Sequence, residues 1–70
     1  MSSKMRIRAA IESIARDLLE QCNDKGQAGY RRIFKHRYGD KDPIAEMDEG
    51  DLRGLIDLFE RQIKSQELKP

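Results

Sequence analysis

Three stretches of the chain repeat apolar residues at the spacing of an α-helix. In the first stretch, residues 4–22, apolar positions recur every three or four residues and fall on a stripe about 80° wide. The members of this stripe are Ile7, Ile11, Ile14, Ala15, Leu18 and Cys22. The pattern predicts an amphipathic helix over about 4–22. Asn23 and Gly26 are expected to end it, since both tolerate the backbone conformation found after helices.

A second, shorter helix is predicted over about 28–38. A loop over residues 23–29, which contains two glycines, is expected to precede it, and Gly39 is its expected C-terminal stop. Its apolar face is formed by Tyr30, Ile33, Phe34 and Tyr38.

The last helix is predicted over about 48–66. Its stripe consists of Leu52, Leu55, Ile56, Phe59 and Ile63, and Gly54 inside it is expected to mark the close approach of a neighbouring helix. Before it, Asp42-Pro43 has the form of an N-cap followed by proline at the first helical position. The pattern therefore predicts an all-α fold: a small three-helix bundle with an extra short helical turn at about 43–47, in a single helical domain over residues 1–70.

Composition agrees with this fold class. Of the 70 residues 39% are charged and 37% apolar, and Ile is the only β-branched residue, which disfavours a sheet. A chain of this length has a thin core and no room for a deep substrate cavity, and a second copy would bury more apolar surface. The single cysteine excludes an internal disulfide, so a cytoplasmic location is expected. No apolar run approaches the ~20 residues that span a bilayer, so we expect no membrane association.

The net charge of +1 conceals an uneven distribution. Residues 30–38 carry four Lys or Arg and no acid, whereas residues 40–51 carry six acids and one lysine. The helix dipole favours acids at a helix N-terminus and bases at its C-terminus, so helix stability alone explains part of this pattern. The first helix opposes the rule, with Lys4, Arg6 and Arg8 in its first turns.

Two interpretations of these opposing bases remain open. They pair with the acidic segment 40–51 inside the molecule, or they join the bases of the second helix in one surface that binds a polyanion. The second interpretation predicts a nucleic-acid interface formed by Lys4, Arg6, Arg8, Arg31, Arg32, Lys35 and His36.

Catalytic and metal-binding motifs are missing from the sequence. Cys22 and His36 are the only Cys and His, too few for a zinc site, and Cys22 lies on the core stripe, where a buried thiol is expected. Segment 40–51 has the length of a calcium loop but lacks its turn glycine and its closing Glu. We therefore expect no enzyme, no cofactor and no metal. A helix-turn-helix is disfavoured because the loop expected over 23–29 exceeds its three- or four-residue turn.

The bases in the first turns of the first helix favour the hypothesis that the chain is a small non-enzymatic accessory or regulatory protein. It would bind DNA or RNA through a basic helical surface. The alternative is a protein-interaction module or small adaptor, with a homodimer among its forms, that uses complementary charged surfaces. Its expected contacts are three leucines off the main stripes and three acids of the connection: Leu19, Leu58, Leu68, Asp40, Asp42 and Glu46.

Overall fold

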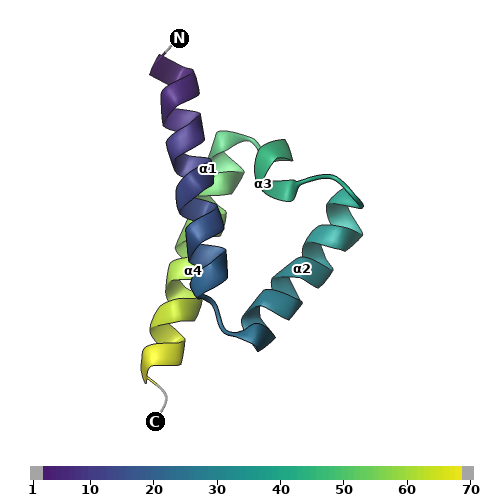
Figure 1. Cartoon of the computed structure of the whole chain (residues 1–70), viewed down its shortest axis with the longest axis vertical. Helices are drawn as coiled ribbons and strands as arrows, with labels where there is room; N and C mark the ends of the chain where they lie inside the picture. The colour runs from purple at the N-terminus through teal and green to yellow at the C-terminus, as the bar shows by residue number, and fades with distance from the viewer. Residues whose placement is uncertain (1–2, 69–70) are drawn as a thin grey trace.

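The computed structural model describes residues 3–68, which form four helices and no strand. These are α1 (Ser3–Gln21), α2 (Asp24–Tyr38), α3 (Pro43–Glu46) and α4 (Glu49–Leu68). Helices α1 and α4 run side by side in the same direction, α2 returns in the opposite direction, and α3 bridges the open end (Figure 1). The molecule is elongated, with extents of 46 × 25 × 16 Å. The predicted small all-α bundle is confirmed.

The connection between α1 and α2 is shorter than predicted. Only Cys22 and Asn23 separate the two helices, and the Asn23 side chain accepts a hydrogen bond from the Gly26 amide at 2.8 Å. The predicted loop over 23–29 and the predicted start at 28 are therefore wrong, because Asn23 is the N-cap of the second helix. Because the connection has only two residues, its length no longer argues against a helix-turn-helix.

A glutamine closes this tight connection. The Gln27 side-chain amide donates to the backbone carbonyls of Glu20 at 3.1 Å and Cys22 at 2.9 Å. These carbonyls lie at the C-terminal end of α1, where a helix leaves acceptors without intrahelical partners. The second helix thus supplies the cap of the first.

The remaining helix boundaries follow the sequence pattern closely. The Asp42 side chain accepts from the Ile44 amide at 3.1 Å and Pro43 occupies the first turn of α3, as predicted for the extra turn. Asp48 caps α4 in the same way, accepting from the Asp51 amide at 2.8 Å.

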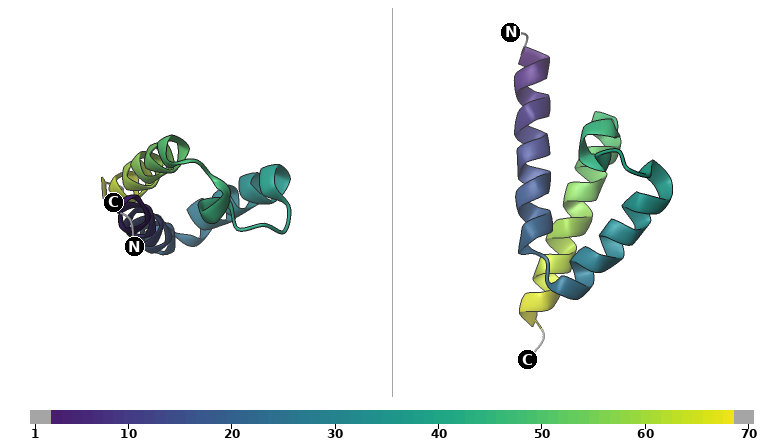
Figure 2. Two further views of the ribbon diagram at one scale, coloured as in Figure 1. Left: turned by 90° about the horizontal axis from the view of Figure 1, so that it is seen from above. Right: turned by 45° about the vertical axis from the view of Figure 1, so that its right-hand side comes forward.

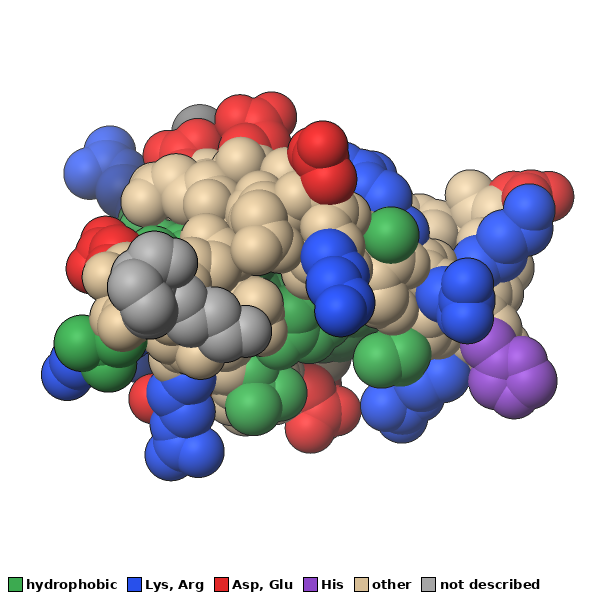
Figure 3. Space-filling view, turned by 90° about the horizontal axis from the view of Figure 1, so that it is seen from below, with side chains coloured by type: hydrophobic (Ala, Val, Ile, Leu, Met, Phe, Trp, Pro, Cys, Tyr) green, Lys and Arg blue, Asp and Glu red, His purple; other side chains and the backbone are tan. Residues whose placement is uncertain are grey.

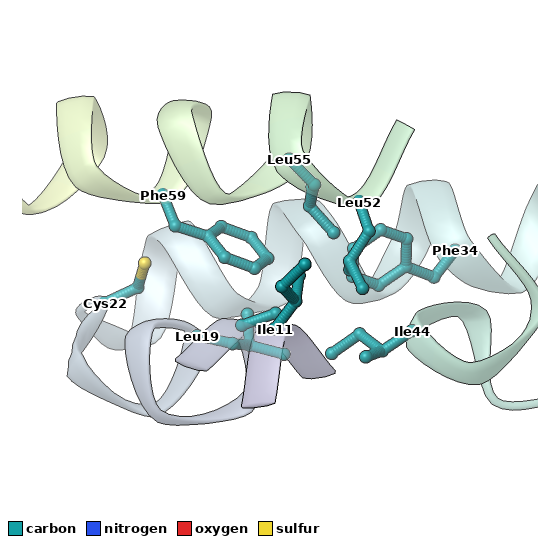
Figure 4. Close-up of a cluster of buried hydrophobic side chains, with 9 residues drawn as sticks. Ile11, Leu19, Cys22, Phe34, Ile44, Leu52, Leu55 and Phe59 are labelled. Carbon is teal, nitrogen blue, oxygen red and sulfur yellow. The ribbon is translucent and has the colours of Figure 1, made fainter. Parts of the chain in front are cut away.

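The hydrophobic core is small and lies between all four helices (Figure 4). Phe59 and Leu52 of α4 are the largest fully buried side chains. The core consists of Ile11, Ala15, Leu19, Cys22, Phe34, Ile44, Leu52, Leu55 and Phe59.

The buried stripe of α1 is rotated from its predicted position. Ile7 and Ile14, predicted to be in the core, are 48% and 49% exposed, whereas Leu19 is only 8% exposed. Leu19 and Phe34 of α2 line the same groove. Because α2 and α3 cover the side of α1 that carries Leu19, the opposite edge of the stripe is left at the surface. The expectation that Leu19 belongs to an exposed patch is wrong.

Helix α2 packs against α4 through its N-terminal half. The Tyr30 ring meets the Phe59 ring edge-on, with centroids 4.8 Å apart. A Cβ added at Gly26 would lie 3.3 Å from Gln62 Nε2, so the two helices are close there. A Cβ at Gly54 would meet nothing within 4 Å, so the close approach predicted at Gly54 is wrong. Toward its C-terminus α2 diverges from α4 (Figure 2).

Two glycine-to-alanine substitutions should change stability in opposite directions. Gly39 has φ 63° and ψ −126°, a conformation that L-residues avoid, so Gly39→Ala should lower the free energy of unfolding by about 1–3 kcal/mol. Gly54 lies inside α4 with open space around it, so Gly54→Ala should raise that free energy by roughly 0.5–1 kcal/mol. Chemical denaturation measures both. Equal effects of the two substitutions would contradict the assigned backbone geometry.

Candidate nucleic-acid interface

The basic side chains of α2 form the candidate interface. Six of them are exposed, and five of these lie together over residues 31–37: Arg31, Arg32, Lys35, His36 and Arg37. Among the residues that the structure describes, none of the five forms an ion pair, and α2 contains a single acid, Asp24. Figure 3 shows Lys and Arg side chains gathered around the histidine at one end of the molecule. This end is rich in Lys and Arg side chains, and an acidic side chain lies beside them in the same view.

The bases differ in what surrounds them on α2. Arg31 and Lys35 line a groove of about 440 Å³ between α1 and α2, which also contains Glu20 and Asp40. At 100° per residue, Arg32 and His36 lie opposite Phe34 and point away from the core. Lys35 also lies about 100° from Phe34, so it borders both the groove and the solvent side, and the outward face of α2 consists of Arg32, Lys35 and His36.

Arg8 is engaged inside the molecule. Its Nε donates to Glu12 Oε2 at 2.8 Å, and its Nη2 donates to the backbone carbonyl of Ile44 at 2.8 Å. A second, longer contact of 3.4 Å reaches the Ala45 carbonyl. This guanidinium therefore ties α1 to α3, and a charged donor to a carbonyl makes a comparatively strong hydrogen bond.

Lys4 and Arg6 are exposed on the first turns of α1. They do not form one surface with the bases of α2, because α3 packs against both helices and lies between them (Figures 1 and 2). Of the seven residues predicted for the interface, the structure groups Arg31, Arg32, Lys35 and His36, and leaves Lys4, Arg6 and Arg8 apart.

An ion pair that sequence reasoning missed connects α1 to the acidic connection. Arg16 Nη2 lies 2.6 Å from Asp42 Oδ2, while Glu12 lies 3.7 Å from the same guanidinium. The hydrogen bond from Arg16 holds the pKa of Asp42 below its ordinary value, and the pKa of Arg16 is raised by the same bond. The spacing of Arg8, Glu12 and Arg16 at four-residue intervals was the available signal for the helical part of this network.

The predicted partner-binding residues lie in three different environments. Asp42 is occupied as the α3 cap and by Arg16, whereas Asp40 and Glu46 are exposed and form no ion pair in the described part of the chain. Leu68 is 77% exposed near the end of α4. Leu58 is 48% exposed and lines an apolar groove between α2 and α4 together with Ile33, which is 52% exposed and which the sequence pattern placed in the core.

The thiol of Cys22 is buried, and its sulfur lies 3.5 Å from the Leu18 carbonyl oxygen. Burial raises the pKa of this thiol, which keeps it protonated and poorly nucleophilic. Within residues 3–68, no group of three or more His, Cys, Asp and Glu side chains is placed to hold a metal ion. No helix in that range combines the length and the apolar character needed to cross a membrane.

Comparisons of the chain with protein-family models, with curated proteins and with solved structures give no match. A functional assignment therefore depends on the geometry and charge of the molecule itself.

The Arg16–Asp42 ion pair should give a measurable pH dependence. Asp42→Asn preserves the cap on α3 but removes the charge. The folded-state pKa of Asp42 lies below the ordinary value of 3.8. The charged carboxylate therefore makes its full contribution to the free energy of unfolding above pH 3.8, and this contribution is lost as pH falls through the lowered pKa. The stability difference between parent and variant should be under about 1 kcal/mol near pH 7, because the pair is half exposed, and should shrink as pH falls below 3.8.

Denaturant unfolding at several pH values measures this difference. Asp40→Asn is the matched control, since Asp40 makes no ion pair among the described residues, and it should show a smaller pH-dependent difference. A difference for Asp42→Asn that is equally large at pH 2 and pH 7 would show that the charge of Asp42 is not its source.

Proposed function

We propose that this chain is a small non-enzymatic accessory protein that binds nucleic acid through the outward face of α2. The observation that supports this function is the distribution of ion pairs. Each pair in the described chain uses a base of α1 or α4, and the exposed bases of α2 are left without carboxylate partners. Phosphates of a nucleic acid backbone are suitable partners for such a face.

The shape of α2 is compatible with this role. It is a 15-residue helix whose outward face is free of the rest of the bundle, and a helix of this diameter enters the major groove of duplex DNA. Its binding should be mainly electrostatic and weakly sequence-dependent, since Arg32 and Lys35 offer charge without a ladder of amide side chains that reads bases. A cytoplasmic location, expected from the single cysteine, stays a prediction.

A second candidate function is protein docking through the apolar groove between α2 and α4. The exposed Ile33 and Leu58 side chains in this groove favour it, because neighbouring exposed apolar residues mark interaction sites in small proteins. The two functions use different faces of α2 and do not exclude each other.

Nucleic-acid binding should fall steeply with salt, and α2 should determine the slope. Fluorescence anisotropy with generic duplex and single-stranded DNA and RNA measures affinity at several salt concentrations. The double variant Arg32→Gln/Lys35→Gln should bind at least about tenfold more weakly at low salt, and its log–log salt slope should be shallower by about two.

Arg53→Gln/Arg61→Gln is the control with the same net charge. These two bases lie on α4 and pair with Glu49 and Asp57, so this variant should leave the slope unchanged. Absence of binding at tens of micromolar protein in low salt would refute the proposed function. An equal loss in the control would show that net charge, and not the α2 face, drives binding.

A further inference from the structure

The groove between α2 and α4 has an apolar floor and two rims of opposite charge. Its volume is about 390 Å³, and Ile33, Leu55 and Leu58 are among its lining side chains. Arg37 lines it from α2 and Asp51 lines it from α4. Neither of these two residues forms an ion pair within the described chain, and the Arg37 guanidinium lies 5.8 Å from the centre of the Tyr38 ring.

The α4 side of the groove is open to close approach. Gly50 and Gly54 lie one helical turn apart there, and a Cβ added at Gly54 would meet nothing within 4 Å. A helix packed over this side of the groove would therefore contact the backbone of α4 as well as the Leu58 side chain.

The charges of the two rims identify the occupant. A two-fold axis parallel to the groove places α2 of one copy over α4 of the other, and these two helices run in opposite directions, as α2 and α4 do within one copy. The C-terminal end of α2 and the N-terminal end of α4 both lie toward α3 (Figure 1), so Arg37 of each copy then faces Asp51 of its partner. A surface whose two halves are complementary in this way matches itself, which is the property of an isologous interface.

The size of the core also favours a second copy. Within residues 3–68 the largest fully buried side chains are Leu52 and Phe59, while Ile33 and Leu58 remain half exposed in the groove. Small domains with such thin cores are commonly stabilised by oligomerisation.

We propose that two copies of this chain associate through the α2–α4 groove, burying Ile33 and Leu58 and pairing Arg37 with Asp51 twice. Dimerisation through this groove leaves Arg32 and His36 on the outward face of α2. The presence or absence of the dimer can therefore be measured independently of nucleic-acid binding.

Sedimentation velocity and light scattering over a wide concentration range test the apolar part of the interface. Leu58→Lys should weaken the dimer at least about tenfold. The matched control is Ile14→Lys, which changes an apolar side chain of nearly equal exposure, 49% against 48%, on α1 outside the groove. The control should leave the dissociation constant unchanged, and circular dichroism confirms that both variants keep their helices.

Charge reversal tests the pairing itself. Arg37→Glu and Asp51→Arg should each weaken self-association at least about tenfold. In a dimer of two identical variant chains, both contacts between positions 37 and 51 join like charges. An equimolar mixture of the two variants should recover the parent affinity, because both contacts in the mixed dimer again join opposite charges. A mere loss of folding in either variant cannot produce this recovery.

A parent chain that stays monomeric at several hundred micromolar would overturn the proposal. A dimer that Ile14→Lys disrupts and Leu58→Lys does not would place the interface elsewhere and would overturn it equally. A mixture that remains as weakly associated as its separate components would refute the Arg37–Asp51 pairing.

Discussion

The edge-on contact between Tyr30 and Phe59 is the packing interaction on which the arrangement of this molecule depends. Phe59 lies fully buried between α1 and α4, and Tyr30 joins the N-terminal half of α2 to it. Beyond this contact α2 diverges from α4, and Phe34 of α2 and Ile44 of α3 complete the core there. A helix fastened at one half leaves its outward side and one lateral groove to solvent, and both proposed binding surfaces arise from this geometry.

The second organising feature is the distribution of charge between the helices. On α1 and α4, acids and bases four residues apart neutralise one another, as Arg8 with Glu12 and Arg61 with Asp57 do. Helix α2 has no acid after its first residue, so its bases lack such partners. The net charge of the chain is close to zero only because the acids lie elsewhere. A basic face on one helix is therefore compatible with a nearly neutral protein.

Much of the fold could be predicted from local sequence, whereas the site could be predicted only in part. Apolar spacing identified the helices, and Asp42-Pro43 and Gly39 marked two boundaries, because each of these signals acts within a few residues. The exposure of Ile14 and the burial of Leu19 depend on where α2 and α3 pack, which no spacing within α1 reveals. The Arg8–Ile44 bond and the Arg16–Asp42 pair join residues far apart in sequence, so the bases of α1 could not be separated from those of α2 beforehand.

The most direct test of the account is a residue-resolved map of the polyanion contact. Amide correlation spectra of the labelled chain, titrated with a short duplex oligonucleotide at low salt, locate the residues whose environment changes. The account predicts that the changes concentrate on α2 around Arg32, Lys35 and His36, while Arg8 and the Arg16–Asp42 pair stay unperturbed. Changes concentrated on the first turns of α1, with α2 unaffected, would contradict it.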